Sequence, residues 1–201
     1  MTSRPIRCIA LACCLALAVP VARAAVTQQV ANPSVVALLD QSQQAIKALR
    51  IDEAHKFADE ALALAEKLGD RVALAMSYEK KADVLFAQSL AKESIVWRQR
   101  AADAFEALGN QAGLADALEG ILAAKIVLGD SSGIRALGDR LIKLNQALGN
   151  EHARAIVISN LVRSQVSPAE EPVWIQELLA IATKLADDGL MGEALVLRAG
   201  R

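Results

Sequence analysis

The sequence predicts an all-α protein: an α-solenoid of about four stacked antiparallel helix hairpins, followed by an incomplete C-terminal helix. Three observations predict it. A short phrase returns at intervals of forty residues, as EKLGD at 66–70, EALGN at 106–110 and QALGN at 146–150. A second break falls about halfway between these phrases. Between the breaks, apolar residues recur at spacings of three and four, and no stretch shows the alternation that is typical of a strand.

Each repeated phrase combines a helix stop with a helix start. Gly69 can take the left-handed backbone conformation that ends a helix, and the side-chain oxygen of Asp70 can cap the free amides of the next helix. Asn110 and Asn150 hold the position of Asp70 in the later phrases, and Gly189 continues the glycine series. Each phrase is therefore interpreted as the joint between one helical hairpin and the next.

The second breaks divide each repeat into two helices. These breaks are AQSLA (87–91), LGDSS (128–132) and SPAEEP (167–172). In the middle break Gly129 and Asp130 repeat the stop-and-cap chemistry, and in the last one Pro172 suits the first turn of a helix. We expect helices at 33–49, 52–68, 71–87, 92–108, 111–127, 132–148, 151–166 and 172–187, and a ninth that begins near Leu190.

The first twenty-four residues have the pattern of a cleaved secretory signal peptide. Arg4 and Arg7 precede the apolar run CIALACCLALAV, which is too short to cross a bilayer as a helix. The small residues of VARA predict cleavage between Ala24 and Ala25, and hence a periplasmic or secreted protein. A lipoprotein signal with Cys13 as the lipidated residue is a weaker alternative, because the preceding IALA fits a lipid-attachment box poorly.

Removal of this signal changes the chemistry that the chain can offer. Cys8, Cys13 and Cys14 all lie within it, so the mature protein should have no disulfide and no thiolate metal site. The signal also carries three arginines and no acid, so the formal net charge falls from −1 to about −4, which argues against a nucleic-acid partner. No later apolar stretch reaches membrane-spanning length, so we expect no membrane insertion of the mature chain.

The predicted organisation follows from the signal and the joints. Residues 25–32 form a short linker and residues 33–201 form one helical repeat domain. The repeat units are expected at 33–69, 70–109, 110–149 and 150–189, with a partial unit at 190–201.

Motifs of catalysis are scarce in the mature sequence. His55 and His152 are the only histidines and have no paired-ligand spacing. The letters of GxSxG occur in GDSSG (129–133) and those of SxxK in SYEK (77–80) and SLAK (89–92), but these strings lie on expected helices or at the breaks between them, and no expected strand precedes GDSSG as a nucleophile elbow requires. Acid pairs such as Asp52–Glu53 lie at expected helix ends, where capping explains them, and Trp97 and Trp174 are interpreted as packing residues. We therefore expect no enzyme, cofactor or metal, with a hydrolase of sparse motifs as the remaining catalytic alternative.

From about Pro33 onward the chain resembles the tetratricopeptide repeat superfamily, in a variant with units longer than the usual length of about 34 residues. The segments AHKFADEALALAEKLGD, ISNLVRSQ and LGDSSGIRALGDRLIKLNQALGN carry the resemblance. The family has a small residue at one position of the first helix. Ala82 occupies this position in one unit, whereas the larger Leu122 and Val162 occupy it in the next two. Other helical arrays, such as HEAT-like repeats, remain the alternative.

The resemblance implies that a ligand binds to the concave surface formed by the first helix of each hairpin. Alignment on Ala82, Leu122 and Val162 places these residues on that surface: Glu79, Asp83, Phe86, Asp116, Glu119, Ile126, Ser159 and Arg163. Such a groove is acidic at one end, which favours a basic or amphipathic peptide as the partner. A solvated helix face that carries the same charges is the alternative interpretation.

Two functional hypotheses follow. The first is an exported, non-catalytic scaffold that binds a protein or peptide through its concave face. The second starts from Leu190, Leu195 and Leu197, which lie in a last helix with little expected cover, so that Arg201 ends an uncapped array. That end predicts either a truncated input domain of a membrane-bound signalling protein, such as a cyclase or kinase, or a homo-oligomer that pairs through the open end.

Overall fold

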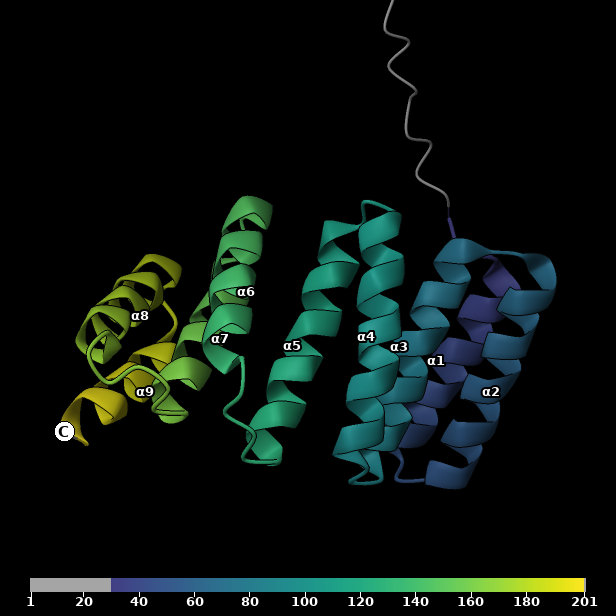
Figure 1. The fold of residues 1–201 in the computed structure, drawn as a ribbon, viewed down its shortest axis with the longest axis horizontal. Coiled ribbons are helices and arrows are strands. Elements are labelled where there is room, and N and C mark those ends of the chain that lie inside the picture. Colours follow the sequence, from purple (N-terminus) through teal and green to yellow (C-terminus); the bar gives the residue numbers. More distant parts are fainter. Residues whose placement is uncertain (1–29, 201) are drawn as a thin grey trace, which may run out of the picture.

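The computed structural model describes residues 30–200, which fold into nine consecutive helices without a strand (Figure 1). The predicted signal peptide, its cleavage site and most of the predicted linker lie outside the described residues. The helices are α1 (Pro33–Lys47), α2 (Ile51–Leu68), α3 (Arg71–Ala87), α4 (Ala91–Ala107), α5 (Gln111–Val127), α6 (Ile134–Leu148), α7 (Glu151–Arg163), α8 (Glu171–Leu185) and α9 (Asp188–Ala199).

The helices stack in chain order, so that each one packs against the next (Figure 1). Among the first helices of the hairpins, α1 contacts α3, α3 contacts α5 and α7 contacts α9, whereas α5 and α7 do not contact each other to that extent within residues 30–200. Within residues 30–200, the second helices α2, α4, α6 and α8 do not contact one another to that extent. Along α1–α5 the first helices are therefore closer to one another than the second helices are, and we call the surface formed by the first helices the inner face. The predicted all-α solenoid is confirmed.

The first joint has the predicted chemistry and also connects two first helices. Gly69 has a φ of 62° and ends α2. Asp70 Oδ1 accepts a hydrogen bond from the backbone N of Ala73 at 2.9 Å, which caps α3. Asp70 Oδ2 accepts another from the backbone N of Asn32 at 2.7 Å. One carboxylate thus holds the starts of α1 and α3 side by side.

The fourth joint differs from the prediction. Gly189 lies inside α9, and Ala186 ends α8 with a φ of 52°. Asp187 then caps α9 by accepting a hydrogen bond from the backbone N of Leu190 at 3.0 Å, so the helix begins before the glycine that the period indicated. Leu190 is also covered, at 6% exposure, whereas Leu195 is 42% exposed.

The start of α6 also differs from the prediction. Asp130 does not cap this helix: Asp130 Oδ1 accepts a hydrogen bond from the backbone N of Ser132 at 3.0 Å, within the turn itself. Asp130 Oδ2 pairs with Lys125 Nζ, and these contacts lower the pKa of Asp130 to about 2. The residue before α6 is Gly133, with a φ of 70° and no side-chain cap. The turn is thus closed by side chains, and the helix starts two residues later than expected.

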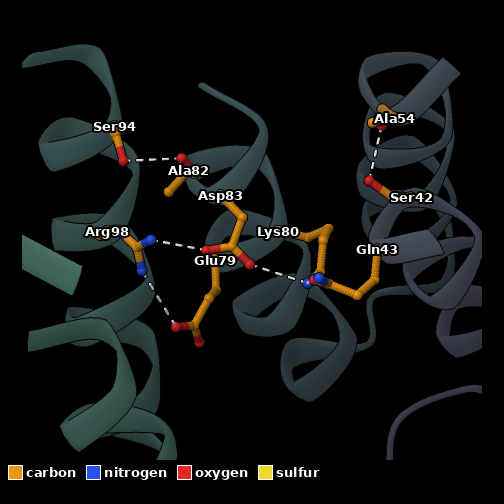
Figure 2. Close-up of polar contacts among 9 residues, drawn as sticks. All are labelled: Ser42, Gln43, Ala54, Glu79, Lys80, Ala82, Asp83, Ser94 and Arg98. Atoms are coloured by element: carbon orange, nitrogen blue, oxygen red, sulfur yellow. Dashed lines mark hydrogen bonds and ion pairs between the residues drawn. The ribbon is translucent and has the colours of Figure 1, made fainter. Parts of the chain in front are cut away.

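In each of the first two hairpins, a hydrogen bond from a serine to the carbonyl of an alanine joins the two helices (Figure 2). Ser42 Oγ on α1 donates a hydrogen bond to the carbonyl O of Ala54 on α2 at 2.8 Å. Forty residues later the serine and the alanine have exchanged helices, and Ser94 Oγ on α4 donates to the carbonyl O of Ala82 on α3 at 2.9 Å. All four residues are fully buried. Two small residues at the contact let the backbones approach closely.

The third and fourth hairpins have large residues at the same two positions. Leu122 and Ile134 occupy them in the α5–α6 hairpin, and Val162 and Trp174 occupy them in the α7–α8 hairpin. Accordingly, α5 and α6 approach each other less closely than α3 and α4 (Figure 1). The width of each hairpin thus follows from the size of one residue pair.

Substitution of Ala82 by Leu is expected to lower the free energy of unfolding by about 2 kcal/mol, because the α3–α4 contact has no room for a larger side chain. Leucine is native at the equivalent position of the wider α5–α6 hairpin, so helix propensity does not predict a loss. Urea denaturation would measure the free energy of unfolding, with Ala87→Leu at the exposed end of α3 as the control. Equal stability of the two variants would contradict this explanation of hairpin width.

Candidate binding groove on the inner face

Four of the residues expected on the concave surface form one acidic cluster between α3 and α5. Glu79 and Asp83 lie one turn apart on α3, and Asp116 and Glu119 lie on α5. The carboxylates of this cluster influence one another: Asp83 raises the pKa of both Glu79 and Asp116, and Asp116 raises the pKa of Glu119. We call these four residues the inner acidic cluster.

Burial is the largest cause of the raised pKa values of Glu79, Asp116 and Glu119 in the inner acidic cluster. Burial, followed by the charges of Asp83 and Asp116, raises the pKa of Glu79 to about 7, and this value includes a partial opposing effect of Arg98 and Lys80. Partial burial of the Asp116 carboxyl, followed by the charge of Asp83, raises the pKa of Asp116 as well. Within residues 30–200 the four carboxyl groups face only two cations, Arg98 and Lys80, and the raised pKa values reflect this shortage of positive charge as well as burial.

A hydrogen bond joins this cluster to α6. Asn145 Nδ2 donates to Glu119 Oε1 at 2.8 Å, and Asn145 is 1% exposed. Burial raises the pKa of Glu119, while the hydrogen bond from Asn145 opposes the rise. The hydrogen bond from Asn145 thus orients the Glu119 carboxyl toward α6, at the side of the cluster farthest along the chain.

Arg98 reaches the inner face from the second helix α4 (Figure 2). Arg98 Nη2 donates to Asp83 Oδ1 at 2.8 Å, Nη1 lies 3.7 Å from Glu79 Oε1, and the residue is 8% exposed. The guanidinium lies against Gly120 of α5, where an added Cβ would be only 2.0 Å from Nη1. A glycine at 120 therefore makes room for the buried arginine.

A pocket of about 250 Å³ lies between α1 and α3, next to the cluster, and we call it the α1–α3 pocket. Lys80 extends across it: Lys80 Nζ donates to Gln43 Oε1 and pairs with Asp83 Oδ2 at 3.0 Å (Figure 2). The pocket is lined by Leu39, Asp40, Gln43, Met76, Glu79, Lys80 and Asp83. Its lining thus combines an apolar part with three acids and one lysine.

The other residues expected on the concave surface lie apart from this cluster. Phe86 and Ile126 are half-buried, and Ile126 packs against the main hydrophobic core. Ser159 is 2% exposed and its Oγ donates to Glu193 Oε1 on α9, to which Arg163 Nη2 also pairs. In this structure α9 therefore covers Ser159, and Arg163 already has an acidic partner.

The histidines and tryptophans lie in ordinary structural contacts. His55 Nδ1 is 3.2 Å from Asp59 Oδ2, and His152 is the partner of the capping residue of α9. Trp174 is buried at 6% exposure, and the half-buried Trp97 packs on Tyr78 with ring centroids 5.8 Å apart. Residues 30–200 bring no three His, Cys, Asp or Glu side chains into a group that could hold a metal ion.

No protein-family model matches this chain, and no curated protein matches it at a significant level. Among the helices of the described range, none has both the length and the apolar character needed to cross a membrane. The groove is therefore interpreted from its own geometry.

Proposed function

We propose that this chain is an exported, non-catalytic scaffold of the tetratricopeptide repeat superfamily that binds a basic or amphipathic segment of a partner protein on its inner face. The observation that carries the proposal is the inner acidic cluster beside the α1–α3 pocket. The proposed location is the periplasm or the extracellular space, after cleavage between Ala24 and Ala25.

The electrostatics of the cluster support a cationic ligand. The carboxylates of Glu79, Asp83 and Asp116 lie close together, and that of Glu79 is largely removed from water, so a cation placed among them relieves repulsion as well as gaining attraction. Asp40 and Asp116 are exposed, and no hydrogen bond or ion pair within the described residues neutralises either of them. These two acids are available to an incoming cation without breaking an internal contact.

The pocket lining supports a ligand with long basic side chains. Lysine and arginine carry an aliphatic stem beneath the charge, and that stem can lie on apolar surface while the charged end meets a carboxylate. Leu39 and Met76 provide the apolar surface, and Asp40, Glu79 and Asp83 provide the acceptors. An amphipathic basic helix could therefore place one such side chain in the pocket and others along α3 and α5.

Charge reversal at the two free acids tests this proposal. Asp40→Arg and Asp116→Arg are each expected to weaken binding of an acetylated amphipathic peptide of arginine, leucine and alanine by about tenfold, without lowering the melting temperature. Fluorescence anisotropy would measure the affinity, and the same peptide with glutamate for arginine should not bind.

The matched controls lie on second helices. Glu66 on α2 and Glu93 on α4 are exposed and lack a partner within the described residues, so Glu66→Arg and Glu93→Arg change the net charge equally. Equal weakening by these controls would show that only the overall charge matters. A peptide that fails to bind the unaltered protein would overturn the proposed function itself.

A further inference from the structure

Lys80 is placed where a ligand cation is expected. Its ammonium lies between Gln43 Oε1 on α1 and Asp83 Oδ2 on α3, and its side chain is only 17% exposed (Figure 2). It therefore fills the polar part of the α1–α3 pocket with a positive charge that belongs to the protein.

Asp83 divides its two oxygens between two cations of different character. Asp83 Oδ1 accepts from Arg98, which is buried and confined between α3 and α5 against Gly120. Asp83 Oδ2 accepts from Lys80, whose ammonium is a compact charge on a flexible four-carbon stem. Arg98 is thus a fixed part of the groove, whereas Lys80 can swing into solvent at the cost of two exchangeable contacts.

We infer that Lys80 is an internal occupant of the cation position in the α1–α3 pocket, and that an arginine or lysine side chain of the partner displaces it on binding. The inference rests on the proposed function of the inner face. The incoming cation takes over Gln43 Oε1 and Asp83 Oδ2 as acceptors, and its stem lies beside Leu39 and Met76. Lys80, once released, is solvated.

The surrounding charges agree with such an exchange. The acids that face the position are Asp40 from α1 and Glu79 and Asp83 from α3, and the nearby cations are Lys80 and the fixed Arg98. Removal of Lys80 leaves three acids with one cation, so an incoming positive charge restores the balance present in the free protein. The exchange therefore requires no net burial of uncompensated charge.

Lys80→Met tests the inference by emptying the cation position while keeping an apolar stem. Affinity for the arginine peptide is expected to rise about tenfold at about pH 8.5, where most of the Glu79 carboxyl is ionised. Lys92→Met on α4 is the matched control, since Lys92 is exposed and free of contacts within the described residues. An unchanged or weaker affinity of Lys80→Met would overturn the inference.

Amine labelling of the unaltered protein separates displacement from a simple charge effect. An acylating reagent should modify Lys80 several-fold faster when the arginine peptide, which has no lysine and a blocked amine, is bound, while Lys92 keeps its rate. If the peptide binds but Lys80 labels at the same rate or more slowly, the inference is wrong and the proposed function stands. If the peptide does not bind at all, both are wrong.

Discussion

Substitution of Arg98 by Met is expected to lower the free energy of unfolding by about 3 kcal/mol at pH 8. The loss arises because the half-buried Asp83 and Glu79 would remain without the guanidinium that Arg98 places 2.8 Å from Asp83 Oδ1. Methionine fills much of the same space, so the missing charge and not a cavity dominates. Urea denaturation followed by circular dichroism measures the change.

The pH dependence of this loss identifies its cause. At pH 5.5 most of the Glu79 carboxyl is protonated in the folded protein, so Arg98→Met should cost less there than at pH 8. Arg71→Met is the control: Arg71 is exposed at the start of α3 and has no partner within the described residues, so little change is expected. An equal loss for Arg98→Met at both pH values would mean that the charge of Glu79 does not contribute, and that packing and the pair with Asp83 account for the loss.

The second large effect concerns Glu79 itself. Its pKa in the folded protein is about 7 against 4.5 for the free side chain, so the folded state holds the proton more tightly than the unfolded state. The contribution to stability is therefore fully present below about pH 4.5 and is lost as the pH rises through about 7. With 1.36 kcal/mol per pKa unit and a side chain that is 19% exposed, the loss approaches about 3 kcal/mol.

Glu79→Gln removes this titration while keeping the shape of the side chain. The variant should match the unaltered protein near pH 4.5 and exceed its stability by up to about 3 kcal/mol at pH 8. The quantity to compare is the difference between the two pH profiles. Asp130 and Glu151 have lowered pKa values, so their contribution to stability grows as the pH rises, and this contribution is the same in both proteins. A Gln variant that is less stable at pH 8 would show that attraction to Arg98 exceeds the cost of burial.

The helices could be predicted because their ends depend on adjacent residues. Gly69 and Asp70 stop one helix and cap the next without help from distant parts of the chain. The fourth joint was predicted wrongly because Ala186 takes the left-handed conformation there, although alanine pays a steric cost that glycine avoids. Asp187 then caps α9, a choice that the spacing of glycines could not reveal.

Some residues of the groove could have been predicted from the forty-residue repeat. Leu39 and Gln43 lie forty residues before Glu79 and Asp83, so the same register applied to the first hairpin identifies both pocket residues. Lys80 also follows Glu79 directly, but its direction across the pocket depends on Gln43 of another helix. Contacts between helices that lie far apart in the sequence are not encoded in any local pattern.

Arg98 shows the limit of sequence reasoning most clearly. Its equivalents in the other hairpins are Ala58, Gly138 and Leu178, all buried, so an arginine at this position signals a buried charge. Its partners on α3 and the space beside Gly120 of α5 emerge only when three helices are stacked. Likewise, no pattern around Ser159 indicated that Glu193 would cover it.

The most direct test of the central proposal is to map the arginine peptide on the protein by amide NMR shifts during a titration. Binding at the inner face predicts that the largest shifts fall on α1, α3 and α5, around Gln43, Glu79 and Asp116, while Glu66 and Glu93 on the second helices stay unchanged. Shifts concentrated on the second helices, or on α8 and α9, would contradict the assignment of the groove.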